Sequence, residues 1–167
     1  MPTLSTVESA QGKNAWAKIE AELRPLLQSL WAAPSAPRLE HVEPIPKEAG
    51  VYLFTAAGKP IYVGQTRNLR RRLADHCRPS SGHNKASFAF LRAKKLYEAK
   101  QNENYAGTRA ALEVAESFPQ LFDEAKTDVA RMDVRFTTCC DAELRTVFEV
   151  YAAELLDTKE FNIFETH

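Results

Sequence analysis

The sequence predicts an α+β fold in which a small three-stranded antiparallel sheet is flanked by helices. Two short runs of β-branched and aromatic residues, 51–54 and 61–63, are joined by an Ala-Gly-Lys turn, a pattern typical of a β-hairpin. Residues 132–138 alternate apolar and polar side chains, which indicates a third strand. Because three strands interspersed with helical segments cannot form a large parallel sheet, a small antiparallel sheet covered by helices is the compact arrangement.

The first predicted element is an amphipathic helix over residues 14–31 that packs on the main body. Its apolar residues recur at intervals of three and four, at Trp16, Ile19, Leu23, Leu26, Leu27 and Leu30. Residues 33–46 contain four prolines and little periodicity, which indicates a linker. The chain therefore divides into an N-terminal helix and Pro-rich linker, residues 1–46, and a main domain, residues 47–167.

Three helical segments are predicted between the hairpin and the third strand. Asn68 is a candidate N-cap for a short basic helix over residues 69–77, and residues 87–98 form a second helix. Residues 108–129 are a further helical region, which we expect to be interrupted at Pro119 because proline lacks the backbone amide. The resulting helical insertion spans about residues 99–130.

The last predicted helix is capped by Asp141 and places an apolar stripe on the core. The stripe consists of Leu144, Val147, Phe148, Tyr151 and Leu155. Residues 158–167 are expected to form an irregular tail that packs through Phe161 and Phe164.

Length and composition indicate one ordinary domain with decorations. The chain has 167 residues, of which 44% are hydrophobic and 26% charged, and it contains no apolar run long enough to cross a bilayer. A membrane partner is therefore excluded. The first residues carry no basic stretch ahead of an apolar segment, so no secretory signal is expected and a cytoplasmic location is predicted.

The cysteines do not indicate a disulfide framework or a zinc site. Cys77, Cys139 and Cys140 are odd in number, and adjacent cysteines do not readily bridge to each other. The sequence contains no CxxC spacing that would favour zinc. We expect reduced thiols.

The charge is unevenly distributed along a chain whose formal net charge is zero. Residues 59–100 hold eleven Lys and Arg against two acidic residues, an excess of nine positive charges, whereas the rest of the chain is acidic. A solvated helix surface would intersperse acids with the bases. The basic segment therefore predicts one positive face directed at a polyanion.

Two triplets and the residues after them carry a resemblance to a known family. Gly-Val-Tyr at 50–52 and Tyr-Val-Gly at 62–64 are followed by Asn68-Leu69 and then by Arg72 and His76. This order and spacing resemble the GIY-YIG endonuclease family, with valine at both isoleucine positions. The resemblance covers residues 50–96 and 132–162, and it implies a GIY-YIG-like fold and cleavage of DNA, with RNA as the alternative substrate.

The resemblance implies a role for each residue of the predicted site. Tyr52 is expected to act as general base on the attacking water or to orient it, and Tyr62 to position the water or the phosphate. Arg72 is expected to bind the scissile phosphate, and His76 to assist proton movement at Tyr52. The residues themselves agree, because Arg72 and His76 are four positions apart and project from one face of a helix. Phosphodiester cleavage needs a base and cations of this kind.

The family also uses one glutamate on a late helix to hold a single divalent cation. Glu149 is the favoured counterpart, which makes it both a catalytic residue and the metal ligand. Glu154 and then Glu143 are the alternatives, and helix periodicity does not decide between them. One Mg²⁺ ion, or Mn²⁺, suits a site with a single carboxylate because it keeps most of its waters.

Further residues are expected to contact nucleic acid. Basic side chains bind phosphates without reading sequence, and the candidates are Arg67, Arg70, Arg71, Arg78, Lys85, Arg92, Lys94 and Lys95. Gly64 joins them. Asn162 either touches the substrate or holds the tail, which lacks the proline that often precedes the family's aromatic-asparagine pair.

Two other functions are compatible with the sequence. One is a nucleic-acid binding module that keeps this fold without cutting, although every expected polar position is filled. The other is an interaction protein whose amphipathic helix over residues 14–30 docks a partner.

Overall fold

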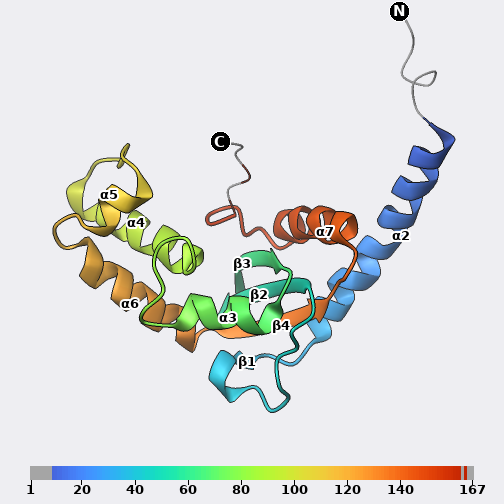
Figure 1. Ribbon diagram of the computed structural model, residues 1–167, viewed down its shortest axis with the longest axis horizontal. Coiled ribbons are helices and arrows are strands. Elements are labelled where there is room, and N and C mark those ends of the chain that lie inside the picture. Colours follow the sequence, from blue (N-terminus) through green and yellow to red (C-terminus); the bar gives the residue numbers. More distant parts are fainter. Residues whose placement is uncertain (1–8, 163, 165–167) are drawn as a thin grey trace, which may run out of the picture.

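The computed structural model describes residues 9–162 and 164. The expected absence of a secretory signal rests on the first residues of the chain, and residues 1–8 lie outside the described residues, as do 163 and 165–167 of the predicted tail. In the described part of the tail Phe161 is buried, as predicted, but Phe164 is 46% exposed, so the predicted packing through Phe164 is wrong. The elements are, in chain order, α2 (Ala10–Ala32), β1 (Ala36–Pro37), the short helix η1 (Arg38–Glu40), β2 (Gly50–Ala56), β3 (Lys59–Thr66), α3 (Leu69–Cys77), α4 (Ser87–Gln101), α5 (Arg109–Glu113), α6 (Phe118–Arg131), β4 (Asp133–Thr138) and α7 (Ala142–Leu155) (Figure 1).

The α+β class is confirmed, but the sheet has one strand more than predicted. Within the described residues it has four strands in the order β1-β4-β2-β3, with antiparallel pairing throughout. The additional strand, β1, pairs Ala36 with Val134 and Pro37 with Asp133. It lies in the segment predicted as linker. Two residues are too few to show alternation, and proline is tolerated there because β1 is an edge strand.

The β2–β3 hairpin has the turn that the sequence predicts. Ala56 pairs with Lys59, and both residues between them have positive φ, 49° at Ala57 and 75° at Gly58. Positive φ at both central positions is the geometry of the two-residue turn that matches strand twist. The turn sets the pairing of Thr55 with Pro60, and a bulge between Thr55 and Phe54 then shifts the register by one residue, so that Phe54 pairs with Tyr62 and Tyr52 with Gly64.

Helices cover both faces of the sheet (Figure 1). Along β2, Val51 and Leu53 are buried in a cluster with residues of α2 and α7. Tyr52 and Phe54 point to the other face and are buried with residues of α3, α4 and α6. This alternation, which follows from the period of two in a strand, places Tyr52 on the same face as the basic helix α3.

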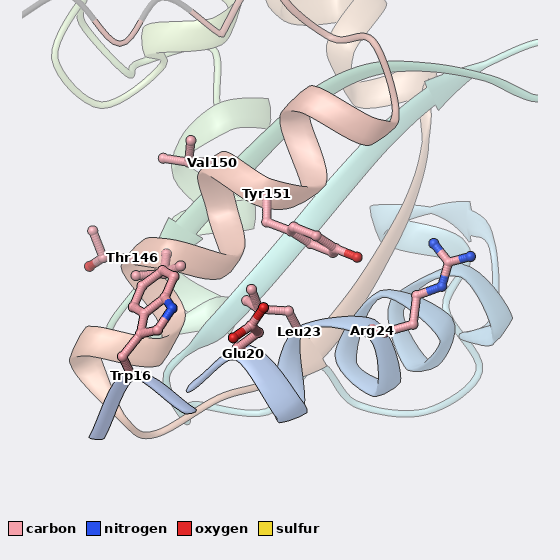
Figure 2. Close-up of a pocket in the computed structure, with 8 residues that line it drawn as sticks. Trp16, Glu20, Leu23, Arg24, Thr146, Val150 and Tyr151 are labelled. Atoms are coloured by element: carbon pink, nitrogen blue, oxygen red, sulfur yellow. The ribbon is translucent and has the colours of Figure 1, made fainter. Parts of the chain in front are cut away.

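The helix α2 packs on α7 and the sheet as predicted, and it is longer than predicted. Leu23 and Leu30 are buried, whereas Trp16, nearer the helix start, is 53% exposed. An apolar groove of about 630 Å³ remains between α2 and α7, lined by Trp16, Glu20, Leu23, Arg24, Thr146, Val147, Val150 and Tyr151. Figure 2 shows side chains of both helices along this groove. Among the described residues, we find no helix with the length and apolar character needed to span a membrane.

Two local predictions differ from the structure. The predicted helix over 108–129 is two helices, and the break precedes Pro119, which lies in the first turn of α6, where its missing amide costs nothing. The apolar stripe of α7 is wrong at Leu155, which is 52% exposed. The stripe continues instead through Ala152, Ala153 and Leu156, because small side chains let this part of the helix approach the sheet closely.

Candidate active site

Tyr52 and His76 form the buried centre of the site. The Tyr52 Oη and His76 Nε2 atoms are 2.8 Å apart, and the two side chains are 1% and 0% exposed. His76 lies on α3, whose first turn is capped by Asn68, as predicted. Its other ring nitrogen, Nδ1, is buried without a hydrogen-bond partner among the described residues. The direction of the bond follows the ionisation of Tyr52: the neutral phenol donates to Nε2, whereas a phenolate accepts from a protonated Nε2.

Arg72 joins this centre from one turn earlier on α3. Its Nε atom donates to Tyr52 Oη at 3.2 Å. The other two nitrogens of the guanidinium face the start of α4: Nη1 donates to the Lys85 carbonyl at 2.9 Å and Nη2 to Ser87 Oγ at 2.7 Å. These contacts fix the plane of the guanidinium beside the phenol.

Tyr62 lies next to Tyr52 on the adjacent strand. The two ring centroids are 6.3 Å apart, and the Tyr62 ring stacks on Phe88 at 4.5 Å with an interplanar angle of 7°. Its hydroxyl interacts with Ser87 and Arg72. Stacking on a buried phenylalanine orients this half-buried phenol toward the same guanidinium.

Gly64 lies beneath the ring of Tyr52. A Cβ atom at this position would be 2.3 Å from Tyr52 Oη and 2.4 Å from Cζ. Predicted as a nucleic-acid contact, Gly64 is buried, and it provides the space in which the Tyr52 phenol lies.

Glu149 approaches the site around the free edge of β3. Its Oε1 atom accepts a hydrogen bond from the Gln65 backbone amide at 3.1 Å. Of the alternatives, Glu154 is exposed and pairs with Lys159 at 2.8 Å, and Glu143 is exposed at the start of α7. Among the three carboxylates, therefore, Glu149 is the one held at the strand that carries Tyr62, and its charge raises the pKa of both phenols.

Asn162 covers the free edge of β3 at Val63, two residues before Gln65. Its Oδ1 accepts from the Val63 amide at 3.0 Å and its Nδ2 donates to the Val63 carbonyl at 2.7 Å. Thr158 also donates to Oδ1. Of the two roles considered for Asn162, the structure supports holding the tail, because its side-chain amide is buried and occupied.

The electrostatics of the site keep the imidazole neutral and the phenols protonated. Burial, and then the charge of Arg72, lowers the pKa of His76 well below its usual value. Burial raises the pKa of Tyr52 and of Tyr62, and this outweighs the lowering by Arg72. The carboxylate of Glu149 raises both phenol pKa values further. Burial also raises the pKa of Glu149 itself, against its hydrogen bonds with Gln65.

The predicted phosphate-binding residues do not all have the same environment. Arg67, Arg71 and Lys85 are exposed. Arg70 is exposed as well, but its Nε atom donates to the Ile45 carbonyl at 2.7 Å. Arg92 is half-buried against the rings of Phe88 and Phe161. The first three are therefore the most available for a strand of nucleic acid.

Sequence reasoning missed Ser87, Phe88 and the Lys85 carbonyl. A serine and a phenylalanine at the start of a helix are ordinary, and a backbone carbonyl has no signature in the sequence. Gln65 was also missed. It binds Glu149 through its amide and accepts from the buried Arg145 through its side chain at 3.1 Å.

Comparison with known proteins finds a family whose model matches part of this chain. Residues 48–112 match the family described as the GIY-YIG catalytic domain. The UvrABC system protein C of Aquifex aeolicus (strain VF5) is 41% identical over 39 residues, which are 23% of this chain and 7% of that protein. No solved structure matches. The resemblance carried by the two triplets is confirmed for residues 48–112, whereas Glu149 lies outside the matched segment.

Proposed function

We propose that the protein is a divalent-metal-dependent endonuclease that hydrolyses phosphodiester bonds in DNA. One observation carries the proposal. In a segment that matches a catalytic domain, Tyr52 Oη lies 2.8 Å from His76 Nε2 and 3.2 Å from Arg72 Nε. Packing alone does not explain a phenol buried between an imidazole and a guanidinium, because phenylalanine would fill the same space without polar atoms to satisfy.

Arg72 binds the scissile phosphate in this proposal. Its Nη1 and Nη2 atoms each use one N–H on the protein, to Lys85 and Ser87, and each keeps a second N–H. Two N–H donors of the guanidinium thus remain for phosphate oxygens. The same charge stabilises the negative charge that develops on the phosphoryl oxygens during displacement.

Tyr52 takes the proton of the attacking water. Its oxygen receives the Arg72 Nε–H, and when Nε2 of His76 carries a proton the phenolate also receives that N–H, so that two donors stabilise it. Against them stand burial and the carboxylate of Glu149, both of which raise the phenol pKa. Ionisation at neutral pH therefore requires a further positive charge near Glu149.

Glu149 fits a magnesium ion. The described residues contain no group of three or more His, Cys, Asp and Glu side chains, so a site that relies on many protein ligands is not available in them. Magnesium accepts a single carboxylate together with waters and phosphate oxygens. When bound, it would supply Lewis-acid stabilisation of the phosphate and cancel the raising of the phenol pKa by Glu149. One Mg²⁺, or Mn²⁺ in its place, is thus proposed at Glu149.

The basic side chains Arg67, Arg71 and Lys85 hold the DNA backbone near this site in the proposal. Contacts to phosphates are insensitive to sequence. Binding is therefore expected to weaken steeply as salt is raised.

Replacement of Tyr52 by phenylalanine tests the proposed base. Nicking of supercoiled plasmid with Mg²⁺ at neutral pH is expected to fall by about 10²–10⁴-fold, the usual contribution of a positioned base. DNA binding measured without metal is expected to stay unchanged. Tyr151→Phe, which lies in the groove between α2 and α7, is the matched control and should cut like the wild type.

The same assay separates the proposal from its alternatives. Wild-type protein that binds duplex, branched and single-stranded DNA or RNA but yields no product with Mg²⁺ or Mn²⁺ is a binding module of this fold. Full nicking by Tyr52→Phe would refute the role of the phenol and leave the nuclease assignment intact.

A further inference from the structure

The loop between α3 and α4 determines how Arg72 is held. We call residues 78–86 the Arg72 loop. Its Lys85 carbonyl accepts Arg72 Nη1, and Ser87, directly after the loop, accepts Nη2. One of the three contacts that orient the guanidinium thus comes from a segment that is neither helix nor strand, and a second comes from the residue that follows this segment at the start of α4.

A buried lysine of the insertion binds backbone carbonyls of the Arg72 loop. Lys126 on α6 is 5% exposed and donates to the carbonyls of Pro79 and Ser81. Its ammonium lies 2.8 Å from Asp123 and 4.5 Å from the centroid of the Phe122 ring. Burying an ammonium group is costly unless its hydrogen atoms find partners, and here most of the partners are loop carbonyls.

A second contact fastens the middle of the loop. Glu113, the last residue of α5, accepts the backbone amide of His83 through Oε1 at 3.1 Å. Its Oε2 contacts His83 Nδ1. Both oxygens of one carboxylate therefore hold one loop residue, two positions before Lys85.

The insertion packs on α3 and α4, the two helices that the Arg72 loop joins. α6 packs against α4 and α3, and α5 packs against α6. A chain of contacts therefore runs from the insertion through the Arg72 loop to the guanidinium and on to Tyr52.

We propose that α5 and α6 form a brace for the active site, in which Glu113 and Lys126 are positioning residues. They hold the Arg72 loop so that the Lys85 carbonyl and Ser87 Oγ fix the guanidinium of Arg72 in the orientation that receives a phosphate. The inference rests on the proposed nuclease function for its effect on catalysis. The geometric part, that Lys126 controls the orientation of Arg72, stands independently of it.

The test uses Lys126→Met and Glu113→Gln in the full-length protein. Methionine keeps the apolar stem that packs on Phe122, and glutamine keeps the shape of Glu113, so both variants are expected to fold. Cleavage is expected to fall by about 10- to 100-fold, because small misplacements of a positioning group cost this much. Lys159→Met, which removes an exposed ion-paired lysine, is the matched control and should leave the rate unchanged.

A double-mutant cycle and a spectroscopic signal separate positioning from general weakening. In an Arg72→Lys background, Lys126→Met is expected to cause little further loss, because the group it positions is already gone. The ¹⁵N–¹H resonance of Arg72 Nε is expected to shift or broaden in Lys126→Met and Glu113→Gln but not in Lys159→Met.

The outcomes are distinguishable. An unchanged Arg72 resonance together with wild-type cleavage in Lys126→Met would overturn the brace. The same would follow from a loss that repeats in full in the Arg72→Lys background. If the wild-type protein cuts no DNA, the proposed function fails, and the Arg72 resonance alone still decides whether the brace exists.

Discussion

Replacement of Glu149 by glutamine is expected to abolish cleavage and, at neutral pH, to raise the melting temperature. The loss of activity follows because the proposed metal ligand is removed while the shape of the side chain is kept. Glutamine Oε1 can still accept the hydrogen bond from the Gln65 amide, so the free edge of β3 remains covered. DNA binding is expected to persist, since a negative charge is removed.

The gain in stability follows from the buried carboxylate. Burial raises the pKa of Glu149 in the folded protein above its value in the unfolded chain. The contribution of the group to stability is therefore full below its ordinary pKa and is lost as the pH rises through the raised value. At neutral pH the ionised carboxylate destabilises the fold, and a neutral glutamine of the same shape avoids this cost.

Melting curves of wild type and Glu149→Gln between acidic and neutral pH check the sign. The difference in melting temperature should be positive at pH 7 and vanish at pH values below the ordinary pKa of glutamate. Glu154→Gln, an exposed carboxylate on the same helix, is the control for both activity and stability. Undiminished cleavage by Glu149→Gln would remove this residue from the site.

Replacement of Gly64 by alanine is expected to damage both the fold and the site. The added methyl group would lie 2.3 Å from Tyr52 Oη and 2.4 Å from Cζ, closer than any contact that packed atoms tolerate. Tyr52 is buried on all sides and has no room to move, so β2 and β3 must separate or the ring must leave its place. Overpacking of this kind costs about 1–3 kcal/mol. Cleavage is expected to fall at least as far as in Tyr52→Phe.

Urea unfolding of the single and double variants tests the cause. If the clash with the phenol is responsible, Gly64→Ala should cost much less stability in a Tyr52→Ala background than in the wild type. Equal costs in both backgrounds would locate the effect in the strand backbone instead. A Gly64→Ala protein with wild-type stability and activity would contradict the close packing of Tyr52 on β3.

The parts of the fold that the sequence predicts well are those with local signals. The β2–β3 turn follows from Ala57 and Gly58, and α3 begins where Asn68 accepts the Arg71 amide at 2.9 Å. Strand β1 was missed because its pairing with β4 joins residues about a hundred positions apart and leaves no pattern in its own two residues. The interruption expected at Pro119 lies just before it, at residues 114–117, because a proline in the first turn of a helix does not break that helix.

The residues of the site also divide into those with a local signal in the sequence and those without one. Tyr52, Tyr62, Arg72 and His76 lie within one hairpin and the helix after it, so their spacing in the sequence is enough to bring them together. The choice of Glu149 over Glu154 needed the free edge of β3, because the Gln65 amide selects the carboxylate that faces it. The contacts of Arg72 with the following loop involve a backbone carbonyl and could not be predicted.

The most direct test of the central claim is whether Glu149 holds a cation beside Tyr52. In NMR spectra of the folded wild-type protein at neutral pH, Mn²⁺ bound in place of Mg²⁺ is expected to broaden the ring resonances of Tyr52, because the proposed ion at Glu149 lies near the phenol whose pKa that carboxylate raises. The broadening should be absent in Glu149→Gln and retained in Glu154→Gln. Wild-type Tyr52 resonances that Mn²⁺ leaves sharp, or broadening that survives in Glu149→Gln, would contradict the proposed site.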